Sequence, residues 1–267
     1  MGLTRSTMDL ITVRETRIAH SRADLTLRSG ERWLGGGTWL FSEEQPGLTG
    51  LVDLTRLDWE PVTRTNEALV IAATCPIGAV RELTDSPLFQ QCADSLLASW
   101  KIQRIATIGG NICMALPAGA MTSLAVALDA TALVWSPDGS DRRIPIHTLV
   151  TGVQRTALEF GEVVRAIEFP SHALSARTAF RRIALSPLGR TGTLVTGRVD
   201  ASGLTVFSVT GGTEAPHRLS FDAPPAASEL ASAIDEITDW YDDAHGAPDW
   251  REAMSRRFAE QVREELS

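Results

Sequence analysis

Apolar positions in the first part of the chain switch between strand-like and helix-like spacing. The strand-like runs lie at 8–19, 32–34, 51–54, 69–74, 132–136 and 142–146. Short helices are predicted over 21–27 and from Pro76 through Leu83. Apolar residues three to four positions apart predict a further helix with one buried stripe. The stripe consists of Phe89, Ala93, Leu96 and Trp100. Another apolar helix is predicted over 121–130, so this part reads as a mixture of strands and helices.

Beyond a boundary near 151–160 the pattern changes to strands joined by turns, followed by two helices. The strands are predicted at 163–169, 179–185, 193–199 and 204–210. The first helix carries Leu230, Ile234 and Ile237. The second is predicted to begin at Asp249, which makes a capping-box pattern with Glu252, and to bury Trp250, Met254, Phe258 and Val262. We therefore predict an α+β chain with a first domain over 1–155, subdivided at about residue 62 into 1–62 and 63–155, and a C-terminal domain over 156–267.

Two glycine-rich turns carry the strongest chemical signal. In ATIGGN, Gly109 and Gly110 lack Cβ atoms, so we predict positive φ there and a nest of N–H groups that binds an anion. Thr107 and Asn111 would flank this nest with a hydroxyl and an amide. In WLGGGTWL, three glycines lead into Thr38. Either turn alone is also typical of an ordinary tight turn, whereas the pair predicts a clamp on the two phosphates of one dinucleotide.

Charge, hydropathy and cysteine spacing exclude several classes of protein. The net charge of −8 argues against nucleic-acid binding, and no apolar run is long enough for a transmembrane helix. Cys75, Cys92 and Cys113 lack the spacing of iron–sulfur ligands, so we expect no [2Fe–2S] centre in this chain. Their odd, scattered count and the absence of an apolar leader predict a cytoplasmic protein. The five histidines lack metal-ligand spacing, so we predict no metal site and name no catalytic residue.

Four motifs make the chain resemble the flavoprotein subunit of molybdenum hydroxylases. They are WLGGGTWLF, the IGA at 77–79, ATIGGNIC and the ALDA at 127–130. This family includes the medium subunit of aerobic carbon monoxide dehydrogenase, the FAD subunit of bacterial nicotine dehydrogenases and the FAD segment of xanthine dehydrogenase. The resemblance covers nearly the whole chain. It implies a two-subdomain FAD-binding domain of the PCMH or vanillyl-alcohol-oxidase type, followed by a C-terminal antiparallel sheet with helices on one face.

The resemblance also implies FAD as the cofactor and assigns its contacts. The first loop matches at Leu34, Gly35, Gly36, Gly37, Thr38, Trp39 and Leu40, and the second at Thr107, Ile108, Gly109, Gly110 and Asn111. Val164 matches an apolar residue near the adenine end of the cofactor. Arg182 matches a lysine that approaches the isoalloxazine, where a cation would stabilise the anionic reduced flavin. A solvated strand charge is the competing interpretation of Arg182.

Two positions depart from the family pattern. Trp39 and Ala120 stand where relatives carry acidic residues, and the acid at the second position holds ribityl or ribose hydroxyls. Losing such a charge-assisted hydrogen bond costs roughly 1.5–3 kcal/mol if nothing replaces it. We therefore expect either weaker FAD binding or a substitute from Thr122 or Ser123.

The function implied by the resemblance is electron relay within a complex. A molybdopterin-containing large subunit would hydroxylate the substrate, and a small subunit with [2Fe–2S] clusters would carry electrons to the FAD of this chain. An external acceptor, such as NAD⁺, a quinone or O₂, would then receive them. Two alternatives stay open: a free-standing FAD-dependent oxidoreductase, for which the sequence offers no active-site acid, and a flavin-free scaffold subunit of the same fold.

Overall fold

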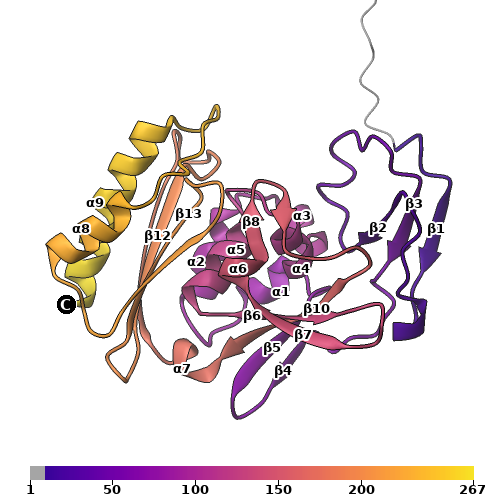
Figure 1. Cartoon of the computed structure of the whole chain (residues 1–267), viewed down its shortest axis with the longest axis horizontal. Helices are drawn as coiled ribbons and strands as arrows, with labels where there is room; N and C mark the ends of the chain where they lie inside the picture. The colour runs from indigo at the N-terminus through magenta and orange to yellow at the C-terminus, as the bar shows by residue number, and fades with distance from the viewer. Residues whose placement is uncertain (1–9) are drawn as a thin grey trace, which may run out of the picture.

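Three larger sheets organise residues 10–267, which are the residues that the computed structural model describes (Figure 1). The first sheet is parallel, with the strand order β1 (Glu15–Ile18), β3 (Gly50–Asp53) and β2 (Glu31–Leu34). Within the edge strand and connector predicted over 8–19, the strand is β1, and residues 8 and 9 lie outside the described residues. The helix predicted over 21–27 is only a 3₁₀ turn, η1 (Arg22–Asp24), because the Asp24 carboxylate accepts the N–H groups of His20 and Ser21 and closes the turn.

The second sheet lies at the centre of the molecule and has β10 as its middle strand (Figure 1). Its order is β4 (Val62–Arg64), β5 (Ala68–Ala72), β10 (Val163–Pro170), β6 (Thr131–Trp135) and β7 (Asp141–Pro145). The sequence analysis placed 163–169 in the C-terminal domain, but its antiparallel partners are β5 and β6. An apolar strand buried along most of its length belongs between two neighbours, and β10 takes that position between β5 and β6.

Helices cover the central sheet. These are α1 (Ile77–Arg81), α2 (Leu88–Ser95), α3 (Trp100–Ile105), α4 (Ile108–Cys113) and α5 (Ala120–Ala127). Phe89 of α2 meets Phe169 of β10 with ring centroids 5.3 Å apart. The predicted stripe that ended at Trp100 is wrong, because the chain turns at Leu97 (φ 51°) and Ser99 caps a new helix. Trp100 is consequently 65% exposed.

The C-terminal sheet is antiparallel and has helices on one face, as predicted (Figure 1). Its order is β11 (Arg177–Ile183), β12 (Thr193–Val199), β13 (Thr205–Thr210) and β14 (His217–Phe221), and its helices are α8 (Ala227–Asp235) and α9 (Pro248–Leu266). The remaining short elements are α6 (Ile146–Leu149), β8 (Val150–Gly152), β9 (Arg155–Thr156) and α7 (Ser171–Leu174). No helix in the described part of the chain is long and apolar enough to cross a membrane.

The predicted capping box of the last helix is absent. α9 begins at Pro248 without a side-chain cap, and Glu252 instead forms an ion pair with Arg256. Its buried stripe includes Arg251 and Ser255, while Trp250 and Met254 are half-buried. Arg251 tolerates burial because the carbonyl oxygens of Gly192, Gly211 and Gly246 and the Asp243 carboxylate accept its N–H groups.

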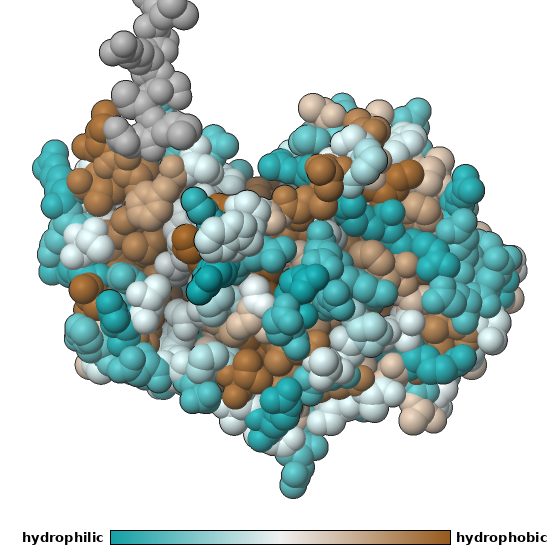
Figure 2. Space-filling model, turned by 180° about the vertical axis from the view of Figure 1, so that it is seen from behind, coloured by the Kyte–Doolittle hydropathy of each residue, from teal (hydrophilic) through white to brown (hydrophobic). Residues whose placement is uncertain are grey.

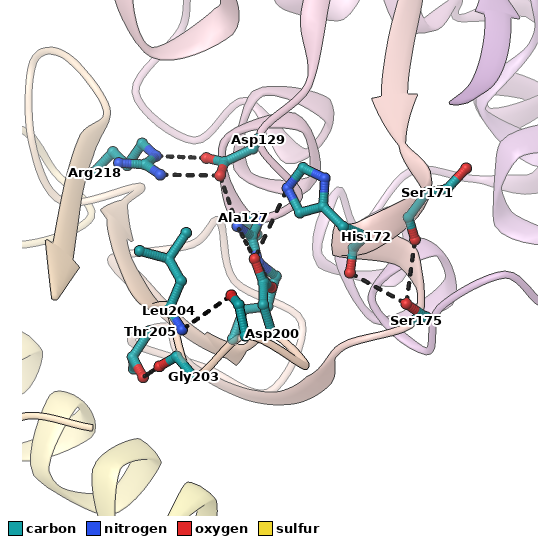
Figure 3. A network of polar contacts seen from close by, with 12 residues as sticks. Ala127, Asp129, Ser171, His172, Ser175, Asp200, Gly203, Leu204, Thr205 and Arg218 are labelled. Atoms are coloured by element: carbon teal, nitrogen blue, oxygen red, sulfur yellow. Dashed lines mark hydrogen bonds and ion pairs between the residues drawn. The ribbon is translucent and has the colours of Figure 1, made fainter. Parts of the chain in front are cut away.

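A buried ionic network joins the central helices to the C-terminal sheet (Figure 3). Arg198 of β12, only 1% exposed, donates to Asp129 Oδ2 at 2.6 Å, to Asp200 Oδ1 at 2.7 Å and to the carbonyl of Ala127 at 3.0 Å. Asp129 also accepts from Arg218. Burial opposes ionisation of Asp129, but hydrogen bonds from Arg218 and Arg198 outweigh it and hold the pKa of this carboxyl below its ordinary value.

We predict that Arg198→Met destabilises the protein by about 3–5 kcal/mol, because it leaves the buried Asp200 carboxylate without its guanidinium partner and Asp129 with Arg218 alone. Chemical denaturation at neutral pH measures the change, and Arg181→Met, which removes a part-exposed ion pair with Glu265, is the matched control. Since Asp129 has a lowered pKa, the stability it contributes is present above the ordinary carboxyl pKa and is lost as the pH falls through the lowered one. An Arg198 variant as stable as the control would contradict the proposed strength of this network.

Candidate functional site

The two glycine-rich loops, far apart in the sequence, touch each other in the structure. A Cβ atom added at Gly36 would lie 1.8 Å from the carbonyl oxygen of Ile105, which ends α3. One added at Gly35 would lie 2.9 Å from Thr107 Oγ1, at the N-cap of α4. Only glycine allows backbones to approach so closely. The structure therefore brings together the two segments that the sequence analysis assigned to one cofactor.

The first loop has free hydrogen-bond donors. Among the described residues, the consecutive backbone N–H groups from Gly35 to Trp39 have no acceptor, although all of these residues are half-buried. Gly37 has a φ of +69°, a left-handed conformation of the kind found in anion-binding nests. Leu34 and Leu40 at its ends pack on Leu48 and Leu51 instead. Such a loop fits the pyrophosphate of FAD, which needs several donors that are not already bonded.

The second loop differs from the prediction. Gly109 and Gly110 do not adopt positive φ; both lie in the first turn of α4. The N–H groups of Ile108 and Gly109 bond to the carbonyls of Cys75 and Ala73. That of Gly110 bonds to Thr107 Oγ1 at 3.1 Å, so this segment is no open nest. Gly109 is required by packing, because an added Cβ would lie 2.5 Å from the Cβ of Ala73.

Three residues of the second loop have definite structural partners. Thr107 caps α4 through its hydroxyl, and Ile108 is fully buried. The Asn111 side-chain oxygen accepts the N–H of Met121 at 2.9 Å and so links α4 to the first turn of α5. Gly110 is exposed, and an added Cβ would contact only Thr107 Oγ1, at 2.8 Å. Its lack of a side chain leaves the surface between the loops open to a ligand.

The segment around Ala120 holds one hydroxyl without a partner. Ala120 is 1% exposed in the first turn of α5. Ser123 is committed, since its hydroxyl bonds to the Gly119 carbonyl and lies 2.7 Å from Thr210 Oγ1. The hydroxyl of Thr122 is buried with no partner among the described residues. Of the two substitutes considered for the missing acid, only Thr122 is therefore available.

Arg182 is held in place on the inner face of the C-terminal sheet. Its Nε donates to Thr191 Oγ1 at 2.7 Å and its Nη2 to the Gly189 carbonyl at 2.5 Å. Burial lowers the pKa of its guanidinium, and no carboxylate in the described part of the chain forms an ion pair with it. A solvated strand charge does not fit this environment. Arg181, on the opposite face of β11, forms an ion pair with Glu265 of α9.

Val164 and Arg165 occupy neighbouring positions at a bulge of β10. Val164 lies opposite Val134 and is 3% exposed within the core, so its assignment to the adenine end remains a prediction. The sequence analysis did not single out Arg165. Its guanidinium lies 4.4 Å from the ring centroid of Trp59 and 5.6 Å from that of Trp135, and burial lowers its pKa. The only feature of the sequence that could have drawn attention to Arg165 is that it places a cation inside an otherwise apolar strand.

The cysteines show no reactive thiol. Burial raises the pKa of Cys75 to about 11 and that of Cys113, just after the GGN turn, to about 12. Both therefore remain thiols at neutral pH. Within residues 10–267 no three histidine, cysteine or acidic side chains gather in an arrangement that would hold a metal ion.

Comparison with known proteins identifies the family. Residues 15–172 match the FAD binding domain in molybdopterin dehydrogenase. The chain belongs to this family. An Escherichia coli K12 protein named as a xanthine dehydrogenase FAD-binding subunit is 31% identical over 105 residues, and the alignment spans 36% of each protein. The family match confirms FAD as the cofactor and places the chain among oxidoreductases.

Solved structures share the fold over nearly the whole chain. Carbon monoxide dehydrogenase from Oligotropha carboxidovorans has a chain with a TM-score of 0.81 at 22% identity, covering 95% of this chain and 98% of that one. Quinoline 2-oxidoreductase from Pseudomonas putida 86 has one with a TM-score of 0.73 at 19% identity, covering 94% and 97%. These likenesses confirm the predicted fold class. The individual FAD contacts remain predictions.

We predict that Gly110→Ala weakens FAD binding at least roughly tenfold, or about 1.4 kcal/mol, while the protein stays folded. A helical alanine gains about 0.5–1 kcal/mol over glycine, which offsets the contact with the Thr107 hydroxyl. Titration of apo-protein with FAD measures the affinity, and thermal unfolding without FAD checks the fold. Gly109→Ala is the control, because Gly109 is required by packing against Ala73. This variant should lower the unfolding temperature, which Gly110→Ala should not do. Unchanged affinity in the Gly110 variant would show that no ligand approaches this position.

Proposed function

We propose that this chain is the FAD-binding electron-transfer subunit of a molybdenum hydroxylase complex. FAD, when bound, would accept electrons from [2Fe–2S] clusters of a small partner subunit and deliver them to an external acceptor such as NAD⁺, a quinone or O₂. A molybdopterin-containing large subunit would hydroxylate the substrate. The observation that carries the proposal is the contact between the two glycine-rich loops, which places free N–H donors beside a family-specific motif. A cytoplasmic location is part of the same proposal.

Each part of the site would have a distinct task. The N–H groups from Gly35 to Trp39, with the Thr38 hydroxyl, would bind the pyrophosphate. Gly110 would leave room for the cofactor, and Asn111, whose oxygen is engaged by Met121, would direct its NH₂ group outward as a donor. Leu34, Leu40, Thr107 and Ile108 would keep the two loops in shape. Val164 would form part of the apolar wall near the adenine.

Arg182 would tune the cofactor electrostatically. A half-buried guanidinium without a counter-ion stabilises an adjacent anion more strongly than an exposed one would, since water screens it less. It remains protonated at neutral pH despite its lowered pKa. Arg182 would thus favour the anionic reduced flavin without itself transferring a proton.

We predict that Arg182→Gln makes the two-electron reduction potential of the bound flavin roughly 30–60 mV more negative, the equivalent of about 1.4–2.8 kcal/mol. Spectroelectrochemical titration of the FAD-loaded chain measures this potential. Arg182→Lys, which keeps the charge, should have a potential close to that of the wild type. Arg181→Gln, on the opposite face of β11, should leave the potential unchanged. Equal potentials for wild type and Arg182→Gln would remove Arg182 from the flavin environment.

Three measurements test the proposed function. Purified protein should release FAD rather than FMN on denaturation, and a tagged chain expressed with its native operon should copurify with a molybdopterin-containing large subunit and an iron–sulfur small subunit. The isolated chain should not hydroxylate substrate. Protein that stays colourless after soaking in FAD would favour the flavin-free scaffold. Substrate turnover by the isolated chain would favour a free-standing flavoenzyme.

A further inference from the structure

The helix α3 presents large apolar side chains to solvent. Trp100 is 65% exposed, Ile105 52% and Ile102 37%, and no residue of this helix is buried. Other helices of the chain, such as α2 and α5, bury most of their apolar residues. The short helix α3 thus exposes a tryptophan and two isoleucines. Together they form an apolar face that no other part of the described chain covers.

This face is continuous with the cofactor loops. The carbonyl of Ile105 is the group against which Gly36 packs. Phe41, 49% exposed, lies against the next residue of the same loop, since a Cβ added at Gly37 would sit 2.4 Å from its ring. Apolar side chains gather beside the hollow between the two lobes of the molecule (Figure 2). We call Phe41, Trp100, Ile102 and Ile105, together with Lys101 and Arg104, the α3 surface.

The charge of the α3 surface is opposite to that of the chain. The protein has 33 acidic residues and a net charge of −8, yet no acidic residue occurs between Ser95 and Leu128. Lys101 and Arg104 lie 5.8 and 5.9 Å from the ring centroid of Trp100, and neither forms an ion pair within the described residues. An apolar centre with an aromatic residue, bordered by Lys101 and Arg104 on the α3 side and by the exposed Glu43 and Glu44 after Phe41, is the composition of a protein interface. Its complement is an acidic partner surface.

We propose that the α3 surface docks the iron–sulfur subunit through an acidic patch with an apolar centre. This inference rests on the proposed function, which supplies the partner but not the surface that it occupies. Docking there would set the partner directly beside the contact between the two loops. It would also bury Trp100, the largest of the exposed apolar side chains in α3.

The test compares variants of the FAD-loaded chain in binding to the purified iron–sulfur subunit. Trp100→Ala and the double variant Lys101→Glu/Arg104→Glu should each weaken binding at least roughly tenfold without altering FAD content or unfolding temperature. Higher salt should weaken wild-type binding and affect the charge-reversed variant much less. Phe160→Ala and Arg56→Glu are matched controls, because both residues are exposed outside the α3 surface, and they should bind as wild type does.

Different outcomes separate this inference from the proposed function. If both α3 variants bind the iron–sulfur subunit with wild-type affinity, the proposed docking surface is wrong, while the proposed function still stands. If the variants keep the affinity for the iron–sulfur subunit but raise the KM for NAD⁺, the surface serves a nucleotide acceptor and the inference is wrong. If wild-type protein binds FAD but captures no iron–sulfur subunit, both the function and the docking surface fail. If it captures the subunit but holds no FAD, only the proposed flavin role fails.

Discussion

The approach of Gly36 to the carbonyl of Ile105 is the constraint on which the candidate site depends. The first loop is positioned by a parallel sheet in which Leu34 ends β2, and the second by a helix packed on the central sheet through Gly109 and Ala73. These are separate structural units with separate cores. In the proposed function, this backbone contact would let donors from one unit and an open glycine from the other serve the same ligand.

The C-terminal sheet is connected to this site by charge as well as by packing. Arg198 and Arg218 both bind Asp129, which follows α5, and Asn111 holds the first turn of the same helix. The helix therefore links the second loop at one end to the C-terminal sheet at the other. Through that connection, Arg182 on the inner face of β11 is kept in a definite position relative to the loops.

The sequence predicted the mixture of strands and helices from the apolar period and the pair of loops from glycine position, whereas the two-subdomain FAD-binding fold was implied by the resemblance to a known family. The sequence predictions failed where tertiary contacts decide which sheet a strand joins, where a helix ends or which side chain is buried. The run at 163–169 reads as a strand in any sheet, and only pairing with β5 and β6 assigns it to the centre. Trp100 has helical spacing from Phe89, but the positive φ at Leu97 breaks that helix. Arg251 was not predicted to be buried, since its carbonyl acceptors come from distant loops.

The glycines of the two loops are required for different physical reasons. Gly37 is needed for its positive φ, and Gly36 and Gly109 for close approach to backbone or side-chain atoms, whereas a Cβ at Gly110 would meet only the Thr107 hydroxyl. Sequence alone treats them alike and predicted a nest at the second loop, whose N–H groups are in fact already bonded. The donors and the open surface thus belong to different loops. In the proposed function, a ligand that uses both would span the contact between them, as an extended dinucleotide such as FAD can.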